Sequence, residues 1–455
     1  MSETARPLNE TIDLLYVHPE HRGVGKNNII PMGVFGLMNS VSCNKLGVMA
    51  RDLTDELIAR AGIIAMDLHW FLALYTAEQT IRRIRKVNPN ARIIVGGYTA
   101  TVFAEIISER YDVDFVIKGD AEVPFKQLVE KLLNSEDVRD VPNLVAKDFS
   151  TPQSFALTTD VYDTVDYITL DWFESFRKEI SNYQKNEFPV TVYPFIPVFK
   201  GCIHDCEFCY GNPRIQKKVC GRGIVVRSPE RVRQDLEAWS NDPEIRTVYM
   251  IMDFIEYPGP EYSDVIFSKK YDLNLYYEFF NLPPLSELDK ALASFNRCFF
   301  YLPLVTDHIG ADVVDFDELR RRLEHLKNRN CKVTFWVNHT LGLKFRNYCA
   351  EALKLRKRYG VDLMNGSGEL MPVPFPNEDK EKLAADFNKY YKQSRKKLSG
   401  AVLEMIMPSI HKSSRLLLCA RRAYTTYYVF TLFLMNIYVK ASGIFPDHIP
   451  PRRKN

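Results

Sequence analysis

Short buried apolar runs alternate with amphipathic helical segments along most of this 455-residue chain, and this alternation limits the fold more than any other feature. Segment 76–91, for example, has Ile81, Ile84 and Val87 at helical spacing and ends in Asn-Pro-Asn. In the first 150 residues the predicted strands are 11–19, 61–71, 92–100 and 113–120, and the predicted helices are 76–91, 101–111 and 122–134. Strands that alternate with helices through short turns predict an α/β fold with a parallel, doubly wound sheet.

Three glycines lie at the predicted carboxyl ends of these strands. Gly96 and Gly97 end one strand, with Thr99 just after them, and Gly119 ends the next strand. Ligands of such sheets bind beyond the carboxyl ends of the strands, where a backbone without Cβ lets a large cofactor approach closely. We therefore expect these four residues to bind a cofactor, and tight packing of a strand-to-helix turn is the competing explanation. No G-x-G-x-x-G occurs, so a dinucleotide site is not predicted.

Residues 190–376 repeat the alternation after a connector at 151–189 that is rich in Tyr and Asp. About six strand–helix units follow one another here, which is enough for a full or partial parallel barrel. Residues 377–455 begin with a charged helical pattern and are predicted to form a mostly helical C-terminal domain. The predicted order is thus a Rossmann-like first domain at 1–150, the connector, a barrel and the helical domain.

Three cysteines lie close together directly after the first strand of the predicted barrel, in the segment FKGCIHDCEFCYGNP. Their spacing is Cys202-x3-Cys206-x2-Cys209. A structural zinc site uses four ligands, usually as paired C-x2-C arms, and the nearest additional candidates are His204 and Cys220. Three thiolates suit an iron–sulfur cluster in which one iron lacks a protein ligand and can hold a small chelating molecule. We predict such a cluster at the rim of the barrel, with zinc or plain structural cysteines as the alternatives.

The composition argues against two other classes of protein. The remaining six cysteines are scattered, and the N-terminus is neither a secretion signal nor an Arg-rich transit peptide, so we expect a reducing, cytoplasmic setting. Sixty basic residues against 57 acidic ones give a formal charge of +3, and no nucleic-acid partner is expected from this balance.

The C-terminal region contains an uncharged run of 17 residues from Ala423 to Val439. This length is at the lower limit for a transmembrane helix, and the run includes Thr, Asn and Tyr side chains. A helix packed over the barrel, or an interfacial helix lying on lipid, agrees better with this mixed polarity. The sequence leaves these alternatives open, and the interfacial one predicts a membrane association through the C-terminal region.

The cysteine segment and the first domain together resemble a known enzyme family. Cys202-x3-Cys206-x-Phe208-Cys209, after the first strand of a βα barrel, is similar to the motif of the radical S-adenosylmethionine enzymes. The stretch ARIIVGGYTATVFAEII and the later GDAEVPF are similar to the members with an N-terminal cobalamin-binding-type domain. The resemblance covers about residues 11–375.

This resemblance implies the cofactors and the type of reaction. In the family a 4Fe-4S cluster on three cysteines binds S-adenosylmethionine at its open iron, and reduction of the cluster yields a 5′-deoxyadenosyl radical. By resemblance Phe208 lies near the adenine, cobalamin binds the first domain, and a flavodoxin or ferredoxin supplies the electron. The Asp-x-His-x-x-Gly motif of cobalamin domains with a histidine ligand is absent, because Asp67-x-His69 lacks the glycine.

Polar residues near the ends of the barrel strands are further candidates. Glu278 lies inside an apolar strand, where a carboxylate needs a partner, and Asp253 ends a strand where the family often has groups that contact S-adenosylmethionine. We predict these two as the catalytic residues. Asn338, at the end of another strand, is a candidate for cofactor binding, although such residues also cap helices or anchor loops. His69 is either a core histidine or part of a cofactor pocket.

Three functions remain open at this point. The first is a cobalamin-dependent methylation of an unactivated carbon in a small-molecule or lipid substrate. The second is a radical dehydratase, epimerase or carbon–carbon bond-forming enzyme whose first domain does not use cobalamin. The third, a non-catalytic protein that carries a cluster or zinc, is the least expected because it leaves an open iron at the barrel rim without a role.

Overall fold

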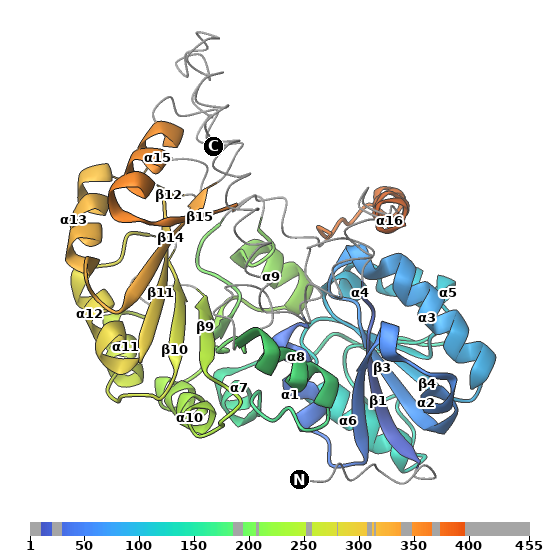
Figure 1. Cartoon of the computed structure of the whole chain (residues 1–455). Helices are drawn as coiled ribbons and strands as arrows, with labels where there is room; N and C mark the ends of the chain where they lie inside the picture. The colour runs from blue at the N-terminus through green and yellow to red at the C-terminus, as the bar shows by residue number, and fades with distance from the viewer. Residues whose placement is uncertain are drawn as a thin grey trace.

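A computed structural model of the chain, drawn in Figure 1, shows one mostly parallel sheet and one parallel sheet with helices around them. It describes residues 11–20, 30–184, 194–205, 209–251, 257–279, 281–306, 312–313, 315–337, 348–365 and 374–395.

The first sheet has six strands in the order β2-β1-β3-β4-β5-β6, parallel except for β6, which pairs antiparallel with β5. Its strands are β1 (Ile12–His18), β2 (Lys45–Met49), β3 (Ala61–Asp67), β4 (Arg92–Gly96), β5 (Phe115–Ile117) and β6 (Leu144–Val145). Its helices are α1 (Met32–Asn39), η1 (Ala50–Asp52), α2 (Asp55–Arg60), η2 (Phe71–Ala73), α3 (Leu74–Val87), α4 (Tyr98–Val102), α5 (Ala104–Arg110) and α6 (Glu122–Leu133).

Both faces of this sheet are covered by helices, as the strand–helix alternation predicts. Leu14 and Tyr16 of β1 pack in the core that contains α1 and α6, whereas Leu15 and Val17 pack in the core that contains α2, α3 and α5. Strand side chains alternate between the two faces of a sheet, so a strand covered on both sides is a continuous apolar run. The predicted helix at 101–111 was wrong in two details: the helix begins at Tyr98, inside the predicted strand 92–100, and the chain breaks at Phe103, which separates α4 from α5.

The predicted connector forms α7 (Thr159–Thr164) and α8 (Glu174–Gln184) and packs against the first sheet. Trp172 and Phe173 meet the ring of Tyr16 edge-on, with centroids 5.9 and 5.8 Å apart. Gly47 of β2 donates its backbone N–H to the Trp172 carbonyl oxygen, and a Cβ at Gly47 would lie 2.7 Å from both aromatic rings. This segment is therefore part of the packed structure of the first domain.

The second sheet is parallel in the order β15-β14-β11-β10-β9, and the bridge between Phe195 and Tyr249 extends it by one position beside β9. Its strands are β9 (Thr247–Ile251), β10 (Asn274–Glu278), β11 (Arg297–Pro303), β14 (Cys331–Val337) and β15 (Asp362–Asn365). Two short antiparallel pairs join β7 (Phe199–Lys200) to β8 (Val225–Val226) and β12 (Val305–Thr306) to β13 (Asp312–Val313). The helices are α9 (Pro213–Cys220), α10 (Pro229–Ser240), α11 (Pro260–Ile266), α12 (Leu285–Ser294), α13 (Phe316–Leu326) and α15 (Tyr348–Tyr359).

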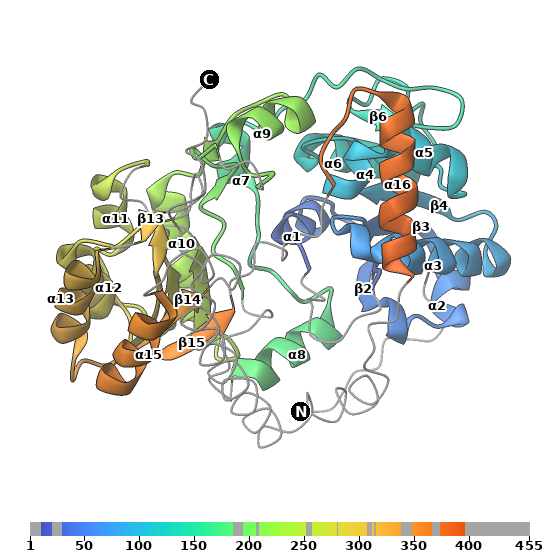
Figure 2. The same ribbon diagram turned by 90° about the horizontal axis from the view of Figure 1, so that it is seen from above.

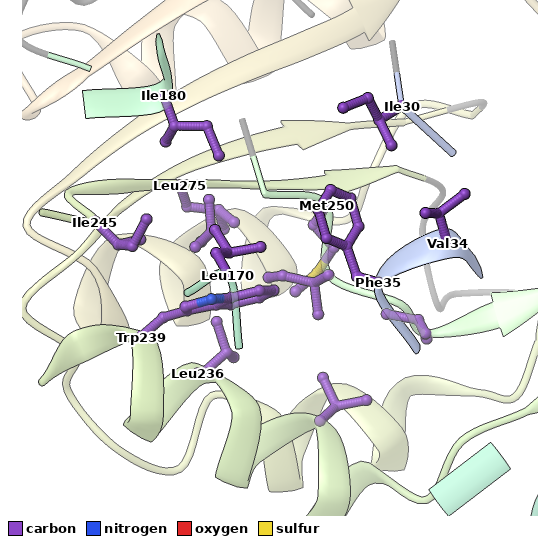
Figure 3. Close-up of a cluster of buried hydrophobic side chains, with 14 of the residues drawn as sticks. Ile30, Val34, Phe35, Leu170, Ile180, Leu236, Trp239, Ile245, Met250 and Leu275 are labelled. Carbon is purple, nitrogen blue, oxygen red and sulfur yellow. The ribbon is translucent and has the colours of Figure 1, made fainter. Parts of the chain in front are cut away.

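One hydrophobic core continues from the first sheet to the second, as Figure 3 shows. Val34 and Phe35 of α1 belong to the same buried cluster as Leu170 of the connector and Trp239 and Met250 of the second sheet and its helices. Burial of apolar surface stabilises a fold by about 25 cal/mol per Å². The two sheets are therefore held together by the same driving force that holds each of them.

Helix α16 (Lys380–Ser394) returns from the second sheet to the first, where it lies across α3 and α5 (Figure 2). Phe387 is buried against Phe103, with ring centroids 5.2 Å apart, and the Tyr391 hydroxyl donates to Glu78 of α3. Residues 396–455, which include the run from Ala423 to Val439, lie outside the described residues. Among the described helices, none has the length and apolar character needed to cross a membrane.

Candidate metal centre

The cysteine segment begins where the first strand of the predicted barrel ends. Residues 194–198 run beside β9, since the Ile196 N–H donates to the Tyr249 carbonyl oxygen at 2.9 Å, and β7 follows directly. The chain then turns at Gly201, whose φ of +92° favours glycine, and delivers Cys202 at the carboxyl edge of the sheet. The expected place of the cysteines at this edge thus agrees with the fold.

Backbone amides face the two described thiols of the motif. The His204 N–H donates to Cys202 Sγ, and the Gly211 N–H donates to Cys209 Sγ, each at 3.4 Å. Burial raises the pKa of the Cys209 thiol above its usual value, and hydrogen bonds from the N–H groups of Gly211 and Asn212 offset part of this rise. Donors of this kind stabilise thiolates, which are the form that binds iron, so the residues present fit a cluster. Cys206 and Phe208 lie outside the described residues.

Asn212 fixes the end of the cysteine segment and the start of α9. Its amide donates to the Cys209 carbonyl oxygen at 2.7 Å, and its Oδ1 accepts from the Ile215 N–H at 2.8 Å as the helix cap. Pro213 occupies the first helical position, where its missing N–H costs nothing. One buried side chain therefore links the third cysteine of the motif to a rigid helix.

Cys220, at the end of α9, has a different environment. It is buried in the hydrophobic core of the first domain, and burial raises the pKa of its thiol to about 12. Its apolar surroundings differ from those of Cys202 and Cys209, whose sulfurs accept hydrogen bonds from backbone N–H groups. This environment agrees with a ligand set that leaves Cys220 out.

Gly97 and Gly119 are in contact with protein. Gly97 has a φ of +103°, and a Cβ there would lie 2.9 Å from the His69 backbone nitrogen. Gly119 has a φ of +69°, and its Cβ would lie 2.6 Å from Gln153 Nε2 and 3.1 Å from the Val219 carbonyl oxygen. Packing and backbone conformation are therefore sufficient to explain both glycines without a ligand. Their role in cofactor binding stays a prediction.

The other two candidates at this edge also have local explanations. Gly96 has ordinary surroundings, since a Cβ there would lie 3.9 Å from the Ile117 carbonyl oxygen. The Thr99 hydroxyl donates to the His69 carbonyl oxygen at 2.7 Å, which ties the start of α4 to the end of β3. The structure thus fits a structural role for both residues, and cofactor binding by them remains a prediction.

Aromatic side chains fill the space between the cysteine segment and the first domain. Tyr210, which follows Cys209, lies against Tyr98 with ring centroids 4.6 Å apart and against His69 at 6.3 Å. Burial lowers the pKa of His69 to about 4, so this imidazole is neutral at physiological pH. His69 therefore belongs to an aromatic cluster next to the cysteine segment.

Glu278 lies at the carboxyl end of β10, on the sheet face that carries Tyr249, Tyr276 and Tyr301. Its Oε2 accepts a hydrogen bond from the Tyr249 hydroxyl at 2.5 Å, which supplies the partner expected for a carboxylate in an apolar strand. Burial raises the pKa of Glu278 to about 7. This carboxyl can therefore hold or release a proton near neutral pH. The other predicted residues of this rim, Asp253 and Asn338, lie outside the described residues.

Two groups of residues were missed in the sequence. The first is a buried cluster at the ends of β1 and β3, where Asp67 accepts from the Tyr16 hydroxyl at 2.5 Å and lies 2.8 Å from His18 Nδ1. The second consists of four charged residues between the first domain and the cysteine segment: Asp120, Glu122, Lys200 and Arg222. In the second group, Lys200 and Arg222 flank the cysteines, whereas Asp120 and Glu122 lie within GDAEVPF. No single sequence motif contains both the basic and the acidic residues.

No family model matches the chain. Among curated proteins, an anaerobic magnesium-protoporphyrin IX monomethyl ester cyclase of Cereibacter sphaeroides is 28% identical over 208 residues, which are 44% of this chain and 31% of the relative. An uncharacterized methyltransferase of Pyrococcus horikoshii is 22% identical over 182 residues, 40% of this chain and 37% of the relative. The chain thus spans about a third of the length of the curated relatives that it matches.

Among solved structures, the radical S-adenosylmethionine methyltransferase TsrM of Kitasatospora setae, with tryptophan and an S-adenosylmethionine analogue bound, aligns with a TM-score of 0.53. The alignment covers 78% of this chain and 72% of that one at 11% identity. At this identity the likeness concerns the fold. The chain therefore shares the fold of this solved methyltransferase, and the resemblance predicted from the sequence is confirmed at the level of the fold.

Proposed function

We propose that this protein is a radical S-adenosylmethionine enzyme that holds a 4Fe-4S cluster on Cys202, Cys206 and Cys209. The observation that carries the proposal is the cysteine segment at the carboxyl edge of the second sheet, with amide N–H groups directed at the Cys202 and Cys209 sulfurs. A cluster bound there would supply the electron that cleaves S-adenosylmethionine to a 5′-deoxyadenosyl radical. A flavodoxin or ferredoxin is the proposed electron donor.

The first candidate reaction is cobalamin-dependent methylation of an unactivated carbon in a small molecule or a lipid. Its support is the fold shared with a radical methyltransferase and the first domain that precedes the second sheet. Glu278 is the described residue best placed to move a proton during the reaction, because it lies at the same sheet edge as the cysteine segment and has a pKa of about 7.

The second candidate is a radical dehydratase, epimerase or carbon–carbon bond-forming enzyme without cobalamin. The observation that favours it is the protein contact at Gly97 and Gly119, since the predicted cofactor glycines face backbone and side chains. The visible spectrum of the anaerobic protein before and after incubation with cobalamin separates the two candidates. A bound cobalamin spectrum supports the first, and its absence under reconstituting conditions supports the second.

The cluster itself is tested by metal analysis of cysteine variants. We expect about four iron and four sulfide per chain after anaerobic reconstitution, and loss of this content in Cys202→Ala, Cys206→Ala and Cys209→Ala. The matched control is Cys220→Ala, which removes a nearby thiol outside the motif and should keep both the iron and the reductive cleavage of S-adenosylmethionine. Stoichiometric zinc without iron uptake would contradict the proposal, and iron loss in Cys220→Ala would show a different ligand set.

A further inference from the structure

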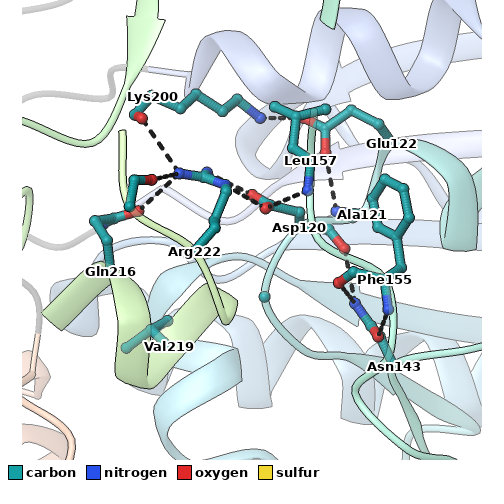
Figure 4. A network of polar contacts seen from close by, with 12 residues as sticks. Asp120, Ala121, Glu122, Asn143, Phe155, Leu157, Lys200, Gln216, Val219 and Arg222 are labelled. Carbon is teal, nitrogen blue, oxygen red and sulfur yellow. Dashed lines mark hydrogen bonds and ion pairs between the residues drawn. The ribbon is translucent and has the colours of Figure 1, made fainter. Parts of the chain in front are cut away.

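Two ion pairs join the first domain to the two ends of the cysteine segment (Figure 4). Asp120 accepts two hydrogen bonds from the Arg222 guanidinium, Nε to Oδ2 at 2.5 Å and Nη2 to Oδ1 at 2.7 Å. Glu122 pairs with the Lys200 ammonium. Lys200 stands two positions before Cys202, and Arg222 stands two positions after the end of α9. The acids thus contact the segment on both sides of its cysteines.

Three of the four charged side chains are buried, while Lys200 is 28% exposed. The side chains of Asp120, Glu122 and Arg222 are 4%, 3% and 8% exposed. Backbone groups complete the hydrogen bonding of the acids, since the Leu157 N–H donates to Asp120 and the Ala121 N–H donates to Glu122. Removing one partner of a buried ion pair is strongly destabilising, because it leaves the other charge buried without compensation.

A third contact joins the two ends of the segment to each other. The Arg222 Nη1 donates to the Lys200 carbonyl oxygen at 3.2 Å, so the residue held by Asp120 also holds the residue paired with Glu122. Close packing supports the same geometry, because Gln153 Nε2 donates to the Val219 carbonyl oxygen at 2.6 Å directly beside Gly119. The separation of residues 200 and 222 is therefore set by the stretch 119–122 of the first domain.

We infer that Asp120 and Glu122 are positioning residues for the cluster, which fix the ends of the cysteine segment and so hold its thiolates in one geometry. The inference rests on the proposed function, since it requires that the cysteines bind a cluster. It assigns the two acids of GDAEVPF to the cluster, and it gives the first domain a task that is independent of cobalamin. Neither acid touches the motif cysteines in any described contact, so their action is through Arg222 and Lys200.

The test compares Asp120→Asn with Asp112→Asn, an exposed acid of the same domain that pairs with Lys147. Both variants are reconstituted anaerobically, and the loss of iron to a chelator and the electron paramagnetic resonance of the reduced cluster are recorded. We expect Asp120→Asn to lose iron at least about ten-fold faster than the wild type and to broaden the spectrum, because the guanidinium is no longer fixed by two charged hydrogen bonds. Asp112→Asn should match the wild type in both measurements.

Two further variants keep the test decisive if Asp120→Asn does not fold. Glu122→Gln preserves the shape of the side chain, and it should also speed iron loss. The exchange Asp120→Arg with Arg222→Asp restores an ion pair and should recover part of the wild-type retention. Wild-type iron retention and spectra in a folded Asp120→Asn, or in Glu122→Gln, would overturn the inference. Failure of the wild type itself to take up iron would instead contradict the proposed function.

Discussion

Glu278 is a carboxylate within an apolar strand, so its position alone predicts that it needs a hydrogen-bond partner. An acid in the apolar run LYYEFF requires a partner, and the structure supplies the Tyr249 hydroxyl from the neighbouring strand. Which tyrosine serves could not be predicted, because Tyr249 and Glu278 are 29 positions apart and are joined by the register of β9 and β10. The sequence thus shows that Glu278 needs a hydrogen-bond partner, and the strand pairing in the sheet determines which residue it is.

The raised pKa of Glu278 predicts a pH dependence of stability. Burial raises this pKa from 4.5 in the unfolded chain to about 7, so the native state binds more protons than the unfolded state between these values. The stability that protonated Glu278 contributes to the folded state is therefore fully present below pH 4.5 and is lost as the pH rises through 7. We therefore expect the free energy of unfolding of Glu278→Gln, relative to that of the wild type, to be on the order of 2 kcal/mol higher at pH 8 than at pH 5.

Urea unfolding of both proteins at the two pH values measures this gain. Glu136→Gln is the control, because Glu136 is exposed on the first domain and its removal should leave the wild-type pH dependence unchanged. Equal pH dependence in the wild type and Glu278→Gln would contradict the assignment of the titration to this carboxyl.

At the scale of elements, periodicity predicted most strands and helices, and the misses have physical reasons. Strand β2, KLGVM, carries a central glycine, which weakens a strand signal, and here that glycine makes room for Trp172 and Phe173. The strand–helix turns at Gly97 and Gly119 were located correctly. Their contacts with Leu68–His69 and with Val219–Cys220 could not be predicted, because they are made by other elements.

Helix α16 provides an element-scale prediction. Phe387 is 1% exposed and packs against Phe103 and Tyr111, so Phe387→Ala leaves a cavity and should destabilise the protein by about 3–5 kcal/mol. Hydrogen exchange of the α16 amides should increase more than that of β3, because the lost contacts attach the helix to the first domain. Lys389→Ala, on the exposed side of the same helix, should change neither the free energy of unfolding nor the hydrogen exchange of α16. Unchanged exchange in α16 of Phe387→Ala would show that this helix is held by other contacts.

For the whole molecule, the two sheets were predictable from the sequence, but their common core was not. The core joins α1, the connector and the second sheet, and the ion pair of Asp120 and Arg222 spans 102 positions of the chain. Such contacts depend on how the two sheets and their helices pack together, and no local sequence pattern predicts that packing. The predicted boundaries at 150 and 190 fall where the sequence changes character, while the core continues across them.

A shared core predicts cooperative unfolding. In the metal-free protein, native-state hydrogen exchange should give the slowest amides of β3 and of β10 the same free energy of opening, within about 1 kcal/mol. Low concentrations of urea should lower the free energy of opening of the β3 amides and of the β10 amides by the same amount. If β3 remained protected under conditions in which β10 exchanges, the two sheets would be independent folding units and the common core would contribute little to stability.

The ion pairs at the cysteine segment also have a consequence for biosynthesis. Asp120 precedes Arg222 by 102 positions in the chain, so the cysteines between residues 200 and 222 are synthesised before the ion pair that fixes the end of their segment can form. Iron delivered to the nascent chain would meet thiols on an unrestrained segment. If the proposed cluster binds this segment, iron and sulfide supplied after synthesis would meet a segment that is already fixed at both ends.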